Sequence, residues 1–219
     1  GTLTTGTVAA TWTGELRPTG LVLHIDVPTM PVRDGYALFA SAIPELATAQ
    51  IDGRFALRAT VELPSQALTW APQLEGLAVS GLGTEDWAQA QSQCSQSLPA
   101  RYRNAAVAPS SLLARAVLAA EDQRFYQHPG YDLREMTQAL HHNQEEDATL
   151  RGASTLSQQV AKLLVTGGER SPVRKLRELL YAVEMEQTLG KARILRLYLN
   201  QAPWGATVCG AQAAAYTYF

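Results

Sequence analysis

The stretch Glu121-Asp122-Gln123-Arg124-Phe125-Tyr126-Gln127-His128-Pro129-Gly130-Tyr131-Asp132 follows directly on an apolar run at residues 112–120. Apolar side chains recur in that run at i, i+3, i+4 and i+7, so we expect a helix with one buried face. Glu121 comes straight after this buried stripe, where a partly buried carboxylate can serve as a general base or acid. Taken alone, Glu121 is better explained as a surface carboxylate paired with Arg124, three residues further on, and only the motifs downstream favour a catalytic role.

The composition describes an ordinary folded protein. The chain has 219 residues, a formal net charge of −2, 46% hydrophobic residues and 17% charged residues, which allows one or two domains. Without a basic excess, we do not expect nucleic acid as a partner. No apolar run of about 18 residues is present, so no spanning helix is expected in this chain. Cys94 and Cys209 are too isolated for a metal site, and their spacing leaves open whether they pair.

Residues 1–95 read as a β-rich domain. Leu21, Leu23, Ile25 and Val27 alternate with more polar residues, and a second alternating run follows the turn signal Asp52-Gly53, at residues 55–63. Residues 6–12 and 77–82 are weaker strand candidates, and a short helix is predicted within 36–49, broken near Pro44. Nothing in this part carries recognisable chemistry, so its role is left as an accessory domain of unknown function.

The remainder reads as helical. A Gln- and Ser-rich linker at 84–110 leads to the first helix, capped by Ser110 or Ser111. A second helix begins after Asp132 and fades into a polar stretch at 141–147, which we interpret as a solvated loop. A third opens at 152–159 with Ser154 or Thr155 as its cap, a fourth starts at Ser171-Pro172, and a last one ends near Asn200. In the third helix Leu156 and Val160 face the core, and Gln158 and Lys162 are predicted on the opposite face.

Glu178 lies on the fourth helix, with Arg174 at i−4 and Lys175 at i−3. On this pattern alone the three residues form a surface salt-bridge ladder. The surrounding segment, residues 170–196, carries seven basic and three acidic residues, a local excess of four positive charges in a chain that is otherwise slightly acidic. Such a patch is either a solvated face or a site that holds phosphates.

Five blocks stand in a fixed order, at residues 121–132, 152–159, 174–178, 194–200 and 210–219. Together they resemble glycosyltransferase family 51, the peptidoglycan transglycosylase domain of class A penicillin-binding proteins and monofunctional transglycosylases. The resemblance covers about residues 99–219. It implies an α-helical, lysozyme-like transglycosylase domain at 99–219. Together with the β-rich domain that precedes it, which is not part of the usual family architecture, the expected fold class is α+β.

The resemblance implies a peptidoglycan glycosyltransferase that polymerises lipid II into β-1,4 glycan strands by inverting displacement of a lipid pyrophosphate. Glu121 resembles the general base, and Glu178 the second carboxylate, near the pyrophosphate, where Mg²⁺ or another divalent cation is expected. Lys162, Arg170 and Lys175 resemble the cations that hold the pyrophosphate. Ser154, Gln158 and Gln159 resemble the polar residues that line the cleft. The chemistry agrees, because a pyrophosphate leaving group needs cations more than it needs an acid.

The resemblance also implies binding partners and a cellular location. The expected partners are lipid II, the nascent glycan strand and the membrane surface. As a separate hypothesis, the β-rich domain is a docking module for cell-envelope proteins. The expected location is the periplasmic, extracytoplasmic face of the bacterial inner membrane, with the anchor outside this chain.

Three departures from the family keep an alternative open. Gln138 stands where Arg is usual, residues 141–150 are polar where family members are often apolar, and the chain ends on aromatic residues at Phe219. The last feature predicts a C-terminally truncated domain. The alternative function is a weak or inactive scaffold module that binds lipid II or glycan. A lysozyme-like hydrolase is disfavoured, because it has no pyrophosphate for the cations to hold.

Overall fold

The computed structural model describes residues 1–89, 108, 110–145, 149, 151–167, 171–205 and 208–219. The chain forms two compact units, and each is assembled from two separate segments. The first unit contains Gly1–Ser80 and Leu133–Ala153, and the second contains Gly81–Asp132 and Ser154–Phe219. The units thus interleave along the chain, whereas the sequence suggested consecutive domains at 1–95 and 99–219. That boundary stays a prediction, since residues 90–107 lie outside the described part.

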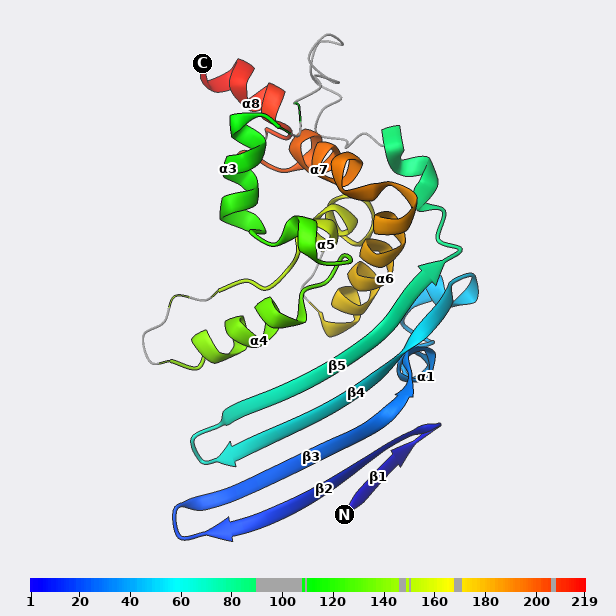
Figure 1. Ribbon diagram of the computed structural model, residues 1–219, viewed down its shortest axis with the longest axis vertical. Coiled ribbons are helices and arrows are strands. Elements are labelled where there is room, and N and C mark those ends of the chain that lie inside the picture. Colours follow the sequence, from blue (N-terminus) through cyan, green and yellow to red (C-terminus); the bar gives the residue numbers. More distant parts are fainter. Residues whose placement is uncertain (90–107, 109, 146–148, 150, 168–170, 206–207) are drawn as a thin grey trace. The chain divides into compact units, whose positions relative to one another are not determined.

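The first unit is built on an antiparallel sheet whose strands follow one another in chain order (Figure 1). Its strands are β1 (Thr2–Thr5), β2 (Val8–Arg17), β3 (Gly20–Pro31), β4 (Gln50–Leu63) and β5 (Ala67–Ser80). The register sets Trp12 opposite Ile25, Ile25 opposite Ala59, and Ala59 opposite Trp70, so these four apolar residues lie on one face of the sheet. The alternation in the sequence therefore predicted the β-rich part correctly.

One end of this sheet is covered by the segment between β3 and β4. A helix within 36–49, broken near Pro44, was predicted here. The helix α1 (Val32–Ala37) begins earlier than that span, and η1 (Pro44–Ala47) lies within it and starts at the proline. Tyr36, Ile43 and Val79 are almost completely buried there and form a small core. This packing gives the sheet a hydrophobic centre of its own.

The helix α4 (Leu133–His142) packs with β5, although about fifty residues of the other unit separate them in sequence. Just after α4, Gln144 pairs with the backbone of Leu68: its Oε1 accepts from the Leu68 N–H at 2.6 Å, and its Nε2 donates to the Leu68 carbonyl at 2.8 Å. Asn143 does the same with Arg151, at 2.7 and 3.0 Å. The start of the polar stretch, predicted to be a solvated loop, thus makes specific backbone contacts.

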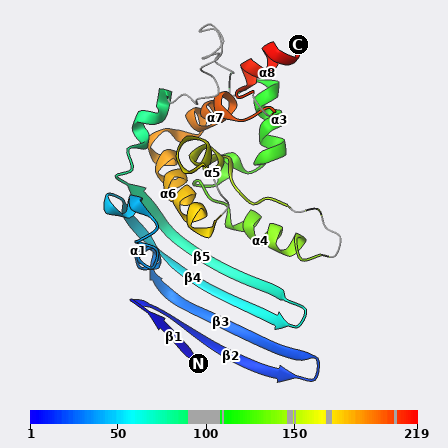
Figure 2. The same ribbon diagram turned by 180° about the vertical axis from the view of Figure 1, so that it is seen from behind.

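The second unit is helical (Figure 2). Its elements are η2 (Thr84–Gln89), α3 (Leu112–Glu121), η4 (Phe125–Gln127), α5 (Leu156–Ala161), the π-helical turn η5 (Lys162–Thr166), α6 (Pro172–Thr188), α7 (Gly190–Gln201) and α8 (Ala211–Tyr218). Phe125, Leu156, Val160, Met185 and Leu195 are buried at its centre. A sheet followed in the sequence by helices is the predicted α+β arrangement. The exception is α4, which belongs to the sheet unit.

Side-chain caps set the starts of three helices, as the sequence predicted. Ser111 accepts from the Ala114 N–H at the start of α3, and Ser171 accepts from the Arg174 N–H at the start of α6, where Pro172 occupies the first turn. Thr155 caps α5 in a capping box with Gln158. Each cap satisfies a backbone N–H that the helix itself leaves without a partner.

Gly130 brings the turn after η4 against α6. Its φ is +94°, in the region that favours glycine, and a Cβ at this position would lie 2.8 Å from the carbonyl oxygen of Ala182. The approach fixes the stretch 121–132 against the helix that carries Glu178.

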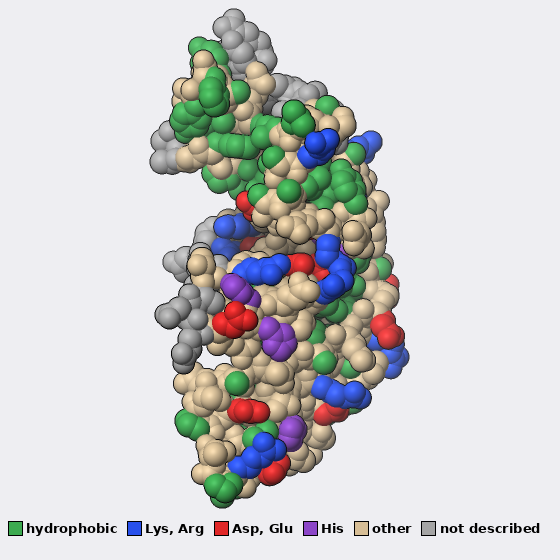
Figure 3. Space-filling view, turned by 60° about the vertical axis from the view of Figure 1, so that its left-hand side comes forward, with side chains coloured by type: hydrophobic (Ala, Val, Ile, Leu, Met, Phe, Trp, Pro, Cys, Tyr) green, Lys and Arg blue, Asp and Glu red, His purple; other side chains and the backbone are tan. Residues whose placement is uncertain are grey.

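Exposed apolar side chains gather at the end of the helical unit where α3 and α8 lie (Figure 3). They include Leu112, Tyr216, Tyr218 and Phe219, each more than half exposed. Among the described residues, no helix combines the length and the apolar character needed to cross a bilayer.

Candidate active site

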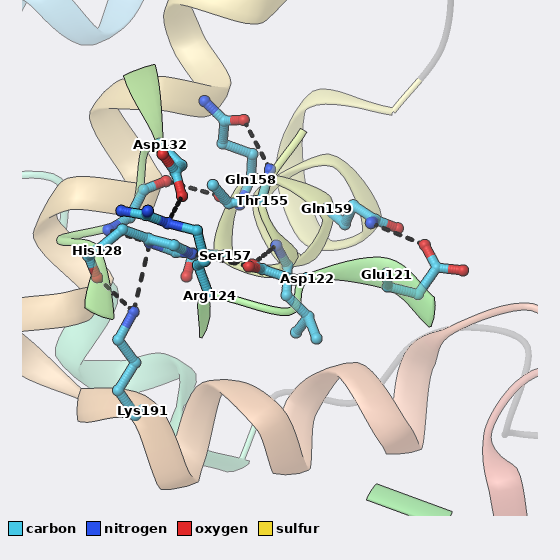
Figure 4. A network of polar contacts seen from close by, with 12 residues as sticks. Glu121, Asp122, Arg124, His128, Asp132, Thr155, Ser157, Gln158, Gln159 and Lys191 are labelled. Carbon is cyan, nitrogen blue, oxygen red and sulfur yellow. Dashed lines mark hydrogen bonds and ion pairs between the residues drawn. The ribbon is translucent and has the colours of Figure 1, made fainter. Parts of the chain in front are cut away.

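Glu121 and Asp122 are neighbours whose side chains do different things (Figure 4). Glu121 ends α3, is exposed, and accepts from Nε2 of Gln159 at 3.1 Å. The Asp122 side chain is almost fully buried, and its Oδ2 accepts from the Leu156 N–H at 2.8 Å. One carboxylate can therefore reach a substrate, and the other ties the start of α5 to the end of α3.

His128 completes the buried side of this network. Its Nδ1 accepts from the Gly130 N–H at 3.2 Å, so the proton of a neutral ring lies on Nε2, which is 3.0 Å from Asp122. Lys191 donates to the His128 carbonyl at 2.6 Å and to Glu186 at 2.7 Å, and its Nζ lies 4.4 Å from the centre of the Phe125 ring. These contacts link the stretch that follows Glu121 to α6 through Glu186 and to α7 through Lys191.

At the start of α5, the position of Gln158 differs from the one that the sequence predicted. Gln158 is 8% exposed, and its Oε1 accepts from the Thr155 N–H at 3.1 Å, while Thr155 Oγ1 donates to the Gly130 carbonyl at 2.7 Å. The prediction that Gln158 lies on an open face with Lys162 is wrong, because a Gln at the third helical position turns back to complete the capping box. Lys162 is exposed, as expected, and Gln159 is the residue that reaches Glu121.

Glu178 is fully buried, so its interpretation as part of a surface ladder is wrong. Its Oε1 lies 3.0 Å from Nε of Arg174, and its Oε2 accepts from Nζ of Lys175 at 2.6 Å. The same Nζ donates to Oγ of Ser154 at 2.6 Å. A buried carboxylate is tolerated when cations pair with it and hydrogen bonds satisfy it. Since the Lys175 side chain stays 44% exposed, the arrangement presents a fixed cation to solvent.

The surroundings of Glu178 do not fit a directly bound divalent cation, because both of its oxygens already face cations. In the part of the chain that the structure describes, no group of three His, Cys, Asp or Glu side chains could hold a metal ion. The expected role of Mg²⁺ stays a prediction.

Tyr198 on α7 is a residue to which the sequence assigned no role. Its burial, and then the negative charge of Glu121, raise the pKa of Tyr198 to about 12. The phenol is therefore neutral at ordinary pH, when its hydroxyl can donate a hydrogen bond. The signal was present, since Tyr198 belongs to the block at 194–200, but spacing cannot show which carboxylate it faces.

The structure places some of the predicted site residues near Glu121 and others near Glu178, and it does not describe Arg170. Gln159 lies with Glu121, and Ser154 and Lys175 lie with Glu178. Arg170 lies outside the described residues, as does Cys94, whose pairing with Cys209 the sequence left open. The roles of all these residues stay predictions as well.

The order of these elements and the residues on them can be compared with known proteins. A family model described as Transglycosylase matches residues 92–219, which is more than half of the chain. The chain belongs to the transglycosylase family. Its helical unit, with Glu121 and Glu178, lies almost entirely within the matched residues, as does α4.

Several proteins resemble this transglycosylase-family chain closely. Relatives named "Biosynthetic peptidoglycan transglycosylase" are 50% identical over 111 residues in Pseudomonas aeruginosa, 49% over 107 residues in Aeromonas hydrophila, and 47% over 110 residues in Alcanivorax borkumensis. These matches cover 51%, 49% and 50% of this chain, and 47%, 45% and 45% of the respective relatives. The chain thus spans about half the length of the curated relatives it matches.

Proposed function

We propose that this chain is a peptidoglycan glycosyltransferase, which polymerises lipid II into β-1,4 glycan strands at the periplasmic face of the bacterial inner membrane. The observation that carries the proposal is the pair of carboxylates in one helical unit, one exposed and one buried beneath two cations. Membership of the transglycosylase family and the names of the relatives support it. Membrane contact and envelope-protein partners of the sheet unit belong to the same proposal.

Glu121 is the general base. It accepts the proton of the acceptor sugar's 4-hydroxyl while that oxygen attacks the anomeric carbon of the donor, and the bond from that carbon to the lipid pyrophosphate breaks. The exposed position of Glu121 suits contact with a large substrate, and Gln159 holds the carboxylate in place. A single displacement on one face of the sugar inverts the configuration.

The cations around Glu178 take up the charge of the leaving pyrophosphate. Lys175 is held between Glu178 and Ser154, so its ammonium group is in place before charge develops. Glu178 is too deeply buried to meet the substrate and acts by positioning Lys175 and Arg174. Lys162 and Arg170 add positive charge to the same substrate group in this proposal.

Polymerisation of fluorescent lipid II in detergent tests the proposal. The wild-type chain should give glycan ladders, Glu121→Gln should lower the rate by about 100-fold or more, and Glu62→Gln, an exposed carboxylate on the sheet, should leave it unchanged. Parallel reactions with Mg²⁺ and with EDTA test the predicted cation. Ladders of normal yield from Glu121→Gln would exclude Glu121 as the base. Binding of lipid II without any polymerisation by the wild type would support the scaffold alternative instead.

A further inference from the structure

A second carboxylate on α6 is buried away from the site just described. Glu184 is 2% exposed, and its oxygens accept from the Leu82 N–H at 2.9 Å and from the Thr84 N–H and Thr84 Oγ1, at 3.2 and 3.1 Å. Thr84 is completely buried, and its hydroxyl also lies 2.8 Å from that of Thr188. These donors belong to residues 81–89, here called the strap.

The strap also contacts α6 through an aromatic pair. Trp87 stacks on Tyr181 with ring centroids 5.2 Å apart, and both Leu82 and Trp87 pack against the hydrophobic core of the helical unit. Tyr181, Glu184 and Thr188 recur at i, i+3 and i+7, so the strap follows one stripe of the helix. A charged carboxylate with several donors is a strong and directional contact.

The same stripe leads to the site. Extended towards the start of α6, it passes Arg177 and Arg174, and Arg174 pairs with Glu178. Glu178 itself lies three residues before Tyr181 on the same helix and is buried. The contacts of the strap therefore hold the helix that carries Arg174, Lys175 and Glu178.

We propose that the strap is a positioning element of the glycosyltransferase site, in which Thr84 and Glu184 fix α6 so that Lys175 and Arg174 meet the leaving pyrophosphate. The strap precedes the family match, which begins at residue 92, so these contacts are an addition to the matched domain. The chain runs from β5, which ends at Ser80, directly into the strap. The effect on catalysis rests on the proposed function. The effect of the strap on the position of α6 rests only on the contacts described above.

Thr84→Val tests it, because valine keeps the shape of threonine and removes the hydroxyl that Glu184 accepts from. Amide hydrogen exchange read by mass spectrometry should become about three- to tenfold faster in residues 172–180, which lie outside direct contact with residue 84. At a temperature where the variant is folded, kcat for lipid II should fall about tenfold with KM within about twofold. Thr84→Ser should restore both, and Thr69→Val, at an exposed position on β5, should change neither.

The two readouts separate the strap from the proposed function. Wild-type exchange rates at 172–180 in Thr84→Val would overturn the inference, and so would faster exchange with an unchanged kcat. If the wild-type chain makes no glycan, the proposed function fails on that result, while the exchange rates still decide whether the strap holds α6. If Thr84→Val does not fold, Trp87→Leu is used instead, because it removes the stacking on Tyr181 and keeps the Thr84 hydroxyl. The same changes in exchange rate and in kcat are then expected, and their absence would overturn the inference.

Discussion

Glu121 and Asp122 show how far two adjacent carboxylates can differ. The first is exposed and meets an amide, whereas the second is buried and satisfies a helix N–H and a histidine ring. Burial decides this division: a base must reach its substrate, while a buried carboxylate must keep its partners. The two residues can therefore be separated by experiment.

We predict that Asp122→Ala lowers the free energy of unfolding by about 2–4 kcal/mol, because the Leu156 N–H at the start of α5 and the Nε2–H of His128 are left buried without their acceptor. Glu121→Gln should change the same free energy by less than about 0.5 kcal/mol, as is usual at exposed positions. Urea unfolding of both variants measures this. Equal losses of stability would contradict the division.

A second prediction concerns alkaline pH. The pKa of Tyr198 is raised to about 12 in the folded chain, from an ordinary value of 10. Above pH 10 the unfolded chain loses this proton and the folded chain keeps it, so Tyr198 stabilises the fold fully below pH 10 and ever less as pH rises to 12. Tyr198→Phe should therefore lose less stability than the wild type between pH 9 and 12. Identical pH profiles would show that Tyr198 does not titrate in this way.

At the scale of elements, Gly130 carries the closest approach between the motif turn and α6. Gly130→Ala should destabilise the chain by about 3 kcal/mol, because the added Cβ meets the Ala182 carbonyl and φ is positive. Gly152→Ala is the matched control: a Cβ there has open space, so we expect a change within about 1 kcal/mol. Thermal unfolding of the two variants measures the difference. A stable Gly130→Ala chain would mean that the turn can move away from α6.

Elements with a clear local signal were predictable from sequence, and their partners were not. Alternation predicted β3 and β4, and Ser111, Thr155 and Ser171 marked the helix starts, because those signals depend on residues close together in the chain. The burial of Glu178 and the inward turn of Gln158 depend on what packs against each helix. An i, i+4 charge pattern looks the same on a surface and over a buried carboxylate, so spacing could not distinguish them.

At the scale of the whole molecule, the least predictable feature is the inclusion of residues 133–153 in the sheet unit. Gln144, whose side chain bonds this segment to β5, gives no sequence signal of that contact, because glutamine is just as common in solvated loops. Its two hydrogen bonds to Leu68 replace the neighbour that an edge strand lacks at that residue.

We predict that Gln144→Ala speeds amide exchange both in residues 67–70 and in residues 139–144, and lowers the stability of the sheet unit by about 1–2 kcal/mol. Gln138→Ala, at an exposed position on α4, is the control and should be neutral. Hydrogen exchange followed by mass spectrometry gives both readings. Faster exchange on α4 alone would show that the sheet edge does not depend on this residue.

The interleaving of the two units also has a consequence for synthesis. A ribosome delivers the five strands before residues 81–132, but the segment that completes their unit, residues 133–153, is made only after that first part of the helical unit. During that interval the outer edge of β5 at Leu68 is without Gln144 and is open to pairing with other nascent chains. We therefore expect the growing chain to be most exposed to such pairing between the emergence of β5 and the emergence of α4.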